Sequence, residues 1–138
     1  MAIRAFLSFV EEDLNLVNLF RGQAKNQRHD LQFDDYSIKI AFDSSNADYI
    51  GRGIAAQIRL TTLTICLYGP TTYQSKWVNW ELNKALEFGK PLMGVSLYSD
   101  GRTKYHPAPL ERWPRLLNWN IPQIVLTMEK LANTYRGR

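Results

Sequence analysis

The sequence of 138 residues is poor in cysteine and lacks long apolar runs. Its single cysteine, Cys66, rules out an internal disulfide and a multi-cysteine zinc site, which favours a reducing compartment. No stretch approaches the ~18 consecutive apolar residues that a membrane-spanning helix needs. Residues 1–10 are apolar, but acidic Glu11, Glu12 and Asp13 follow at once, unlike in a secretory signal peptide. We therefore expect a cytoplasmic protein with no membrane partner.

Motifs of several common enzyme classes are also missing. Gly51 and Gly53 have no third glycine at the spacing of a phosphate-binding loop, and they do not follow a predicted strand. The sequence contains no HExxH, CxxC or G-x-S-x-G motif. The two histidines, His29 and His106, lie far apart in polar segments and are interpreted as solvated surface residues. These patterns predict no metal site.

The composition is that of an ordinary folded domain with a modest basic excess. Hydrophobic residues make up 45% and charged residues 22%, a balance that excludes wholesale disorder. A chain of this length is expected to form a single domain, residues 1–138. Its 17 basic and 13 acidic residues leave a net charge of +4, spread along the chain. We therefore do not expect a nucleic-acid partner, and a basic nucleotide- or nucleic-acid-binding module stays an alternative.

Segments of strand and helix type alternate along the chain. The apolar, β-branched segments predicted as strands are residues 4–10, 31–33, 61–68, 91–98 and 115–119. The segments predicted as helices are residues 11–26, a stretch capped within 44–46 that reaches Ile58, residues 75–88 and residues 120–131. Residues 102–114 hold three prolines and predict a long loop. The alternation is typical of an α/β fold in three layers, with four to five parallel strands flanked by helices.

Ligands of such sheets bind beyond the carboxyl ends of the strands. This rule places six residues and their loops on one rim of the predicted sheet: Ser8, Phe9, Asp34, Asp35, Gly69 and Tyr98. The acidic pair resembles the pocket of a receiver domain, but Tyr68-Gly69 stands where that domain has its phospho-acceptor aspartate. A plain capping or Asx-turn role for the two aspartates stays open.

The predicted helix 75–88 carries the most informative side chains. At about 100° per residue, Trp77, Glu81 and Phe88 lie along one edge of its apolar stripe. A carboxylate one turn beyond a large aromatic side chain, at the border of buried and wet surface, is a candidate for an ionised group in a partly apolar cleft. The alternative is a Trp77 packed in the core and a solvated Glu81.

Four sequence blocks, taken together in their order and spacing, form a fairly specific pattern. They are residues 4–9 (RAFLSF), 33–37 (FDDYS), 62–69 (TLTICLYG) and 77–82 (WVNWEL), the last followed by GKP at 89–91. On these blocks, residues 3–100 resemble the TIR family, and more closely the TIR-like domain proteins of bacterial Thoeris antiphage defence. The resemblance implies a flavodoxin-like (TIR) fold.

The resemblance also implies an activity, which is cleavage of NAD at the nicotinamide–ribose bond. On this reading NAD is the substrate and no cofactor is needed. In the Thoeris branch the product resembles a cyclic or conjugated ADP-ribose, a diffusible signal that activates a partner effector. The family positions fall here on catalytic Glu81, its companion Trp77, nucleotide-lining Ser8 and Phe9, and acidic Asp34 with Asp35 beside it.

The chemistry of this cleavage agrees with a site that holds one carboxylate. Nicotinamide leaves as a neutral pyridine, so no general acid is needed, and the enzyme must stabilise an oxocarbenium-like ribosyl cation. Aromatic faces such as Phe9 and Trp77 are suited to stacking on the nicotinamide or adenine ring. A loop such as 99–114 is expected to exclude water and steer the cation to another acceptor.

A non-catalytic role is the main alternative. A TIR-like interaction module, or a nucleotide-binding scaffold, would have the same sequence blocks. Such a module would self-associate through its helix faces, with Trp80, Trp113 and Trp119 as candidate contacts because aromatic residues favour interfaces.

Overall fold

The computed structural model describes residues 2–35, 41–112 and 116–136. Its strands are β1 (Ile3–Ser8), β2 (Leu31–Asp34), β3 (Leu63–Tyr68), β4 (Leu92–Ser96) and β5 (Leu116–Leu117). Its α-helices are α1 (Leu14–Gln27), α2 (Ala47–Leu60), α3 (Lys76–Glu87) and α4 (Ile121–Arg136). Short 3-10 helices are η1 (Glu11–Asp13), η2 (Thr72–Gln74) and η3 (Ala108–Arg112). The predicted alternation of strands and helices is confirmed.

The strands form one parallel sheet in the order β2-β1-β3-β4-β5. The chain passes outward from β1 to β2 and then returns to the other side of β1 with β3, so the direction of winding reverses between β1 and β3. Ser8, the last residue of β1, lies opposite Cys66 of β3 in the register. This order is that of a flavodoxin-like α/β fold, as predicted, and its ligand crevice is expected where the winding reverses.

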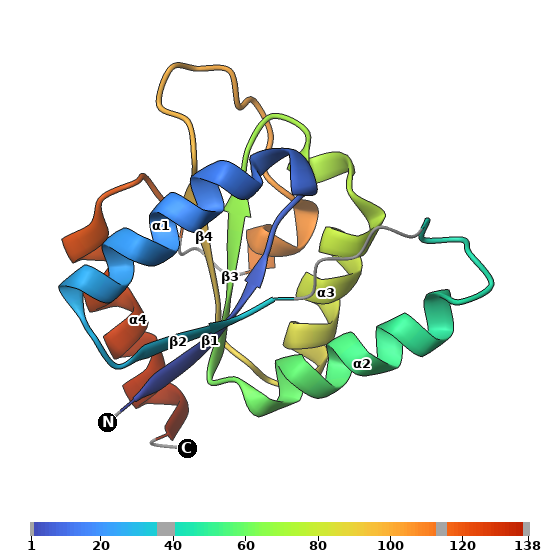
Figure 1. Ribbon diagram of the computed structural model, residues 1–138, viewed down its shortest axis with the longest axis horizontal. Helices are drawn as coiled ribbons and strands as arrows, with labels where there is room; N and C mark the ends of the chain where they lie inside the picture. Colours follow the sequence, from blue (N-terminus) through green and yellow to red (C-terminus); the bar gives the residue numbers. More distant parts are fainter. Residues whose placement is uncertain (1, 36–40, 113–115, 137–138) are drawn as a thin grey trace.

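Two hydrophobic clusters attach helices to the two faces of the sheet. In Figure 1, α1 and α4 lie to the left of the sheet, and α2 and α3 lie to its right. Ala5 and Leu7 of β1 belong to the cluster with α1 and α4, whereas Phe6 belongs to the cluster with α2 and α3. Successive residues of a strand point to opposite faces, so Ser8 lies on the same face as Phe6, toward α2 and α3.

Both ends of α3 are fixed by hydrogen bonds that the sequence predicted. The Ser75 hydroxyl accepts a hydrogen bond of 3.1 Å from the backbone N–H of Val78 at the amino end. At the other end Gly89 adopts a φ of 71°, and the Lys90 N–H donates to the Ala85 carbonyl at 2.9 Å. This is a Schellman ending, which favours glycine at the left-handed position. The helix that carries Glu81 is therefore held in place along its length.

Some boundaries differ from the sequence-based expectation. The acidic residues 11–13 form η1 instead of the first turn of α1, and Asp13 is buried. The expected loop 102–114 contains η3, where the prolines permit a short helix whose Pro109 and Leu110 are buried. The predicted strand 115–119 is described only as Leu116–Leu117. Residues 36–40 and 113–115, which include Trp113, lie outside the described residues.

The final helix begins as predicted and ends later. Asn120 Oδ1 accepts a hydrogen bond of 3.1 Å from the Gln123 N–H, and α4 continues beyond the predicted end at residue 131. In the described part of the chain, α4 and the other helices all lack the combined length and apolar character needed to cross a bilayer.

The packing of β4 against β5 and η3 leaves no room for a side chain at Gly94. A Cβ there would lie 2.8 Å from Leu116 Cδ2 and 2.9 Å from Leu110 Cδ1, so we expect Gly94→Ala to lower the free energy of unfolding by about 1–3 kcal/mol. Gly22 of α1 is the matched control, because a Cβ there meets nothing within 4 Å. Gly22→Ala should stabilise by about 0.5–1 kcal/mol. Urea denaturation measures both, and equal midpoints for the two variants would contradict this packing.

Candidate active site

The carboxyl group of Glu81 lies inside the protein, at the point where the winding of the sheet reverses. Its residue is only 4% exposed, and Ser8 Oγ donates a hydrogen bond of 2.6 Å to Glu81 Oε1. Ser8 is itself buried at the end of β1, opposite Cys66 of β3. The structure therefore brings together an acid from α3 and a hydroxyl from β1 at the crevice position of this fold.

Burial raises the pKa of Glu81 to about 8. The hydrogen bond from Ser8 lowers that pKa, because it favours the ionised form, and the negative charge of Asp35 raises it again. The Glu81 carboxyl is consequently protonated in most molecules of the ligand-free protein at about pH 7. A cation placed beside the group would favour loss of this proton.

The prediction that Glu81 lies at the edge of the helix, at the border of buried and wet surface, is wrong. Spacing along α3 groups Glu81 with Trp77 and Phe88, both of which are half-buried, yet Glu81 itself is buried more deeply than either. The reason is its partner: the small side chain of Ser8 leaves space under α3 and also supplies a hydrogen bond. A helical repeat indicates which residues share a face of the helix. It does not indicate which of them will find space and a hydrogen-bond partner on the neighbouring strand.

Asp35 is the second acid near Glu81, at the carboxyl end of β2. Arg21 of α1 forms an ion pair with it, with 2.9 Å between Nη2 and Oδ1. The same guanidinium lies 6.0 Å from the centroid of the Phe9 ring. The two predicted residues Phe9 and Asp35 are thus linked through Arg21. The sequence did not predict a role for Arg21, because it is one of several polar residues on α1 and has no distinctive spacing.

Asp34 is not brought to Glu81. Its carboxylate accepts a hydrogen bond from Arg4 Nε and forms an ion pair with that guanidinium. In the register of β1 and β2, Asp34 lies opposite Phe6, and Arg4 precedes Phe6 by two residues on the same face. The Asp34 carboxylate is therefore engaged by Arg4, whereas Ser8 binds Glu81.

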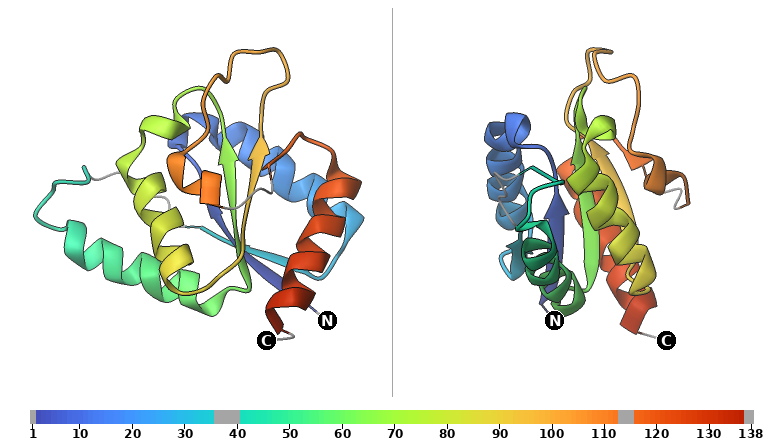
Figure 2. Two further views of the ribbon diagram at one scale, coloured as in Figure 1. Left: turned by 180° about the vertical axis from the view of Figure 1, so that it is seen from behind. Right: turned by 90° about the vertical axis from the view of Figure 1, so that its right-hand side faces the viewer.

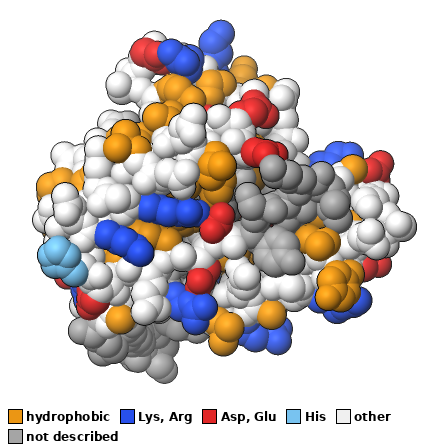
Figure 3. All heavy atoms as spheres, viewed as in Figure 1, with side chains coloured by type: hydrophobic (Ala, Val, Ile, Leu, Met, Phe, Trp, Pro, Cys, Tyr) orange, Lys and Arg blue, Asp and Glu red, His pale blue; other side chains and the backbone are white. Residues whose placement is uncertain are grey.

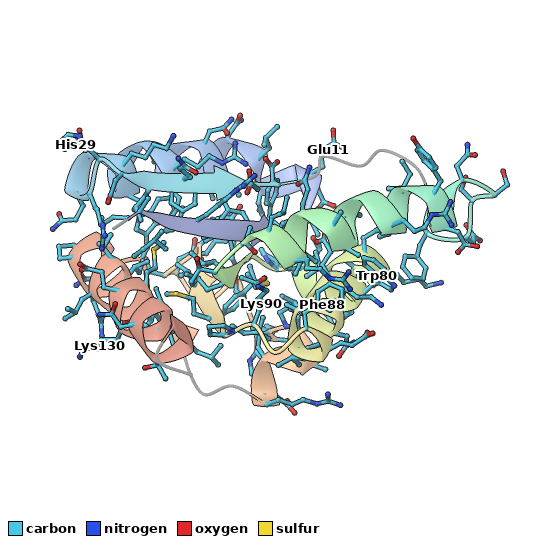
Figure 4. All side chains as sticks on the ribbon, turned by 90° about the horizontal axis from the view of Figure 1, so that it is seen from below. Glu11, His29, Trp80, Phe88, Lys90 and Lys130 are labelled. Atoms are coloured by element: carbon cyan, nitrogen blue, oxygen red, sulfur yellow. The ribbon has the colours of Figure 1, made fainter. Side chains whose placement is uncertain are left out.

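Trp77 lies one helical turn before Glu81 and belongs to an aromatic cluster. Its ring centroid is 4.9 Å from that of Phe42 and 5.7 Å from that of Trp80. Trp80 is half-buried between α2 and α3 (Figure 4). It packs closely against Gly51, where an added Cβ would lie 3.3 Å from Trp80 Cζ2. Trp80 is therefore less exposed than its role as a candidate contact suggested, and that role stays a prediction. These three rings and Arg52 line a cavity of about 320 Å³.

Asp13 is a second buried acid at the carboxyl-end edge of the sheet, and the sequence did not predict a role for it in the site. The Tyr98 hydroxyl, just after β4, donates a hydrogen bond of 3.0 Å to Asp13 Oδ1. A Cβ at Gly69, which follows β3, would lie 2.7 Å from Asp13 Oδ2. Burial raises the pKa of Asp13. Tyr98 also lines a larger cavity over the carboxyl ends of β3, β4 and β5.

The distribution of metal-ligating and charged side chains among the described residues, and on one face of the protein, bears on metal and polyanion binding. Among the described residues, no three His, Cys, Asp or Glu side chains gather as a metal site would require. On the face drawn in Figure 3, Lys and Arg side chains alternate with Asp and Glu and form no continuous basic patch among the described residues. His29 is exposed, as predicted, but His106 is half-buried and lines the larger cavity.

Comparison with known proteins matches residues 6–102 to the family described as Thoeris protein ThsB, TIR-like domain. No curated protein matches. A 3-dehydroquinate dehydratase-like protein from Bifidobacterium longum is similar in structure, with a TM-score of 0.58 and 12% identity over 97% of this chain and 98% of that one. A fungal multi-domain GH3 beta-N-acetylglucosaminidase with a GCN5-related N-acetyltransferase region also has a TM-score of 0.58, at 10% identity over 97% of this chain and 14% of that one. At such identities the two structures indicate the fold alone.

The raised pKa of Glu81 predicts a stability that falls as pH rises. Between about pH 4.5 and about pH 8 the folded protein holds a proton on Glu81 that the unfolded chain has lost. The free energy of unfolding should therefore fall by up to about 1.4 kcal/mol per pH unit in this window. Glu81→Gln keeps an oxygen to accept from Ser8 and removes the titration, so it should be more stable than wild type at the alkaline end.

Urea denaturation of wild type and Glu81→Gln across this pH window measures the difference. Glu87→Gln, on the same helix with a side chain 63% exposed, is the matched control and should follow wild type. Parallel pH curves for wild type and Glu81→Gln would show that the carboxyl is not held in its neutral form.

Proposed function

Because the chain belongs to the Thoeris ThsB family with a TIR-like domain, and so to antiphage defence, we propose that it cleaves NAD at the nicotinamide–ribose bond. The observation that supports this most is the buried carboxyl of Glu81, hydrogen-bonded to Ser8 at the crevice of the sheet. A buried acid in low-dielectric surroundings acts strongly on a positive charge that develops beside it.

The reaction requires that the bond between ribose C1′ and the nicotinamide nitrogen break. The bonding electrons go to that nitrogen, which neutralises the pyridinium ring, and the ribose is left as an oxocarbenium-like cation. In the proposed mechanism ionised Glu81 stabilises this cation, while Ser8 holds the carboxylate in orientation through its hydroxyl. Capture by water or by a hydroxyl completes the step and releases one proton.

The substrate itself supplies the condition for ionising Glu81. The nicotinamide ring of NAD carries a positive charge, and a cation within a few ångströms of a carboxyl lowers its pKa. Binding of NAD would thus be coupled to loss of the Glu81 proton. Asp35 adds a second negative charge near the ribose, and its ion pair with Arg21 keeps that charge in place.

The aromatic residues near the crevice are proposed to bind the rings of NAD. Trp77 is one turn from Glu81 on α3, and Phe9 directly follows Ser8. Rings in these positions are suited to stacking on nicotinamide or adenine. Asp34 is not included in the proposed site, because its carboxylate is paired with Arg4.

We further propose that the product is an ADP-ribose derivative, cyclic when an internal hydroxyl captures the cation. It would act as a diffusible signal to a partner effector in the defence system. Self-association of the domain through its helix faces would complete or shield the site. A shielded cation meets less water, which favours capture by an internal hydroxyl over hydrolysis.

The direct test is release of nicotinamide from NAD by wild type and Glu81→Gln. We expect Glu81→Gln to lose at least about 100-fold in turnover, because a neutral amide cannot stabilise the ribosyl cation. The assay is run with and without a crowding agent, and mass spectrometry identifies the product. Glu87→Gln is the matched control and should keep full activity. Equal turnover by the two variants would rule out this mechanism.

The hydrogen bond from Ser8 predicts a change in pH dependence. Because kcat/KM reports the ionisation of free enzyme, it should rise with pH up to about 8 in wild type, following the pKa of Glu81. Ser8→Ala removes a hydrogen bond that favours the carboxylate, so the rising limb should move to higher pH. Activity at about pH 7 should fall by about tenfold and recover at alkaline pH. A loss that is the same at every pH would mean that Ser8 acts in another way.

A non-catalytic interaction module is the second candidate, and one observation favours it. Glu81 is protonated and hydrogen-bonded in the ligand-free protein, as a purely structural acid would be. On this reading Glu81→Gln would be more stable than wild type, and neither protein would release nicotinamide under any assembling condition. The turnover assay with product identification therefore separates the two candidates.

A further inference from the structure

A second cavity lies over the carboxyl ends of β3, β4 and β5. Its volume is about 720 Å³, within the range of small-molecule sites, and it is lined by Tyr68, Tyr98 and Trp119 among others. The chain that follows β4 rises beyond the strands (Figure 2), and its residues Ser99, Thr103 and Lys104 line the cavity. Neither Ser8 nor Glu81 is among the residues that line this cavity, so it is distinct from the site of Glu81.

Two buried polar atoms of residues that line this cavity have no hydrogen-bond partner. They are Thr103 Oγ1 and His106 Nε2, and neither finds a partner in the described part of the chain. Tyr68, which is 9% exposed, lines the cavity beside them. The nearest carboxylate to His106 Nε2 is that of Glu111, at 3.8 Å, which is too long for a hydrogen bond. Buried polar atoms are normally satisfied, so an unmet group of this kind indicates a ligand or water.

The charge in the cavity is positive. Lys104 lines it and has no ion-pair partner among the described residues. The neighbouring Arg102 is instead paired with Asp100, at 2.6 Å, and lies 4.7 Å from the centroid of the Tyr98 ring. One ammonium group is therefore free to meet an anion, beside hydroxyl and imidazole groups.

We propose that this cavity is a second ligand site, for a ribose 5-phosphate group carried by a nucleotide or by ADP-ribose. Lys104 would bind the phosphate as a cation, and the hydroxyls of Tyr68 and Thr103 with His106 would bind ribose and phosphate oxygens. The Trp119 ring supplies an apolar wall for the flat face of the sugar or its base. The site goes beyond the proposed cleavage of NAD and does not depend on it.

Binding is tested by NMR titration of wild-type protein with AMP, ADP-ribose, ribose 5-phosphate and inorganic phosphate. The indole N–H signals of Trp119 and Trp77, assigned through Trp119→Phe and Trp77→Phe, report on this cavity and on the Glu81 side respectively. We expect the three ribose phosphates to shift the Trp119 signal. AMP against ADP-ribose then shows which source of the ribose phosphate binds more tightly.

Charge reversal identifies the anion-binding residue. Lys104→Glu should weaken binding of ribose 5-phosphate by about tenfold or more, because it replaces a charge-assisted contact with repulsion. Lys130→Glu, on α4 (Figure 4), is the matched control and should bind as wild type does.

Three results would overturn the proposal. They are equal affinities for Lys104→Glu and Lys130→Glu, shifts confined to Trp77, and inorganic phosphate binding as tightly as the ribose phosphates. No shift with any probe would overturn it as well. Nicotinamide release is not measured in this experiment, so its outcome is independent of the proposed NAD cleavage.

Discussion

The hydrogen bond from Ser8 to Glu81 is the contact on which the site depends. It joins the end of β1 to the middle of α3, so it couples the sheet to the helix that covers it. A buried carboxyl without this donor would have a still higher pKa and a larger cost of burial. A larger residue at position 8 would fill the space into which the Glu81 side chain extends. One short hydroxyl residue therefore both admits the acid and limits its rise in pKa.

The parallel sheet supplies the setting for that contact. Its winding reverses between β1 and β3, the position at which ligand crevices of such sheets are expected, because neighbouring crossover connections leave there in opposite directions. Ser8 reaches this crevice because it is the last residue of β1 and shares a face with Phe6. Both ends of α3 are fixed, by the cap at Ser75 and by the ending at Gly89. The helix therefore holds Glu81 at a defined position along the sheet. The positions of β1 and α3 thus fix the location of the Glu81 carboxyl without a bound ligand.

The sequence predicted the parts of this arrangement that depend on local chemistry. The cap at Ser75, the ending at Gly89 and the alternation of strands and helices all follow from residues close in the chain. Contacts between distant segments were not predictable, because they depend on register and on which helix edge meets the sheet. The burial of Glu81 is one such contact, and the ion pair of Asp34 with Arg4, 30 residues away, is another.

The proton on Glu81 also bears on which substrate the proposed site accepts. The oxidised nicotinamide ring is cationic, so it favours the ionised form of a nearby carboxyl whose pKa is raised to about 8. The reduced ring is neutral and gives no such preference, and it also lacks the positive nitrogen that makes nicotinamide a good leaving group. A carboxyl that is neutral in the ligand-free protein therefore favours the cationic oxidised ring over the neutral reduced ring. The same burial that disfavours the resting anion strengthens its attraction to the cation when it forms, since both effects come from the low dielectric around Glu81.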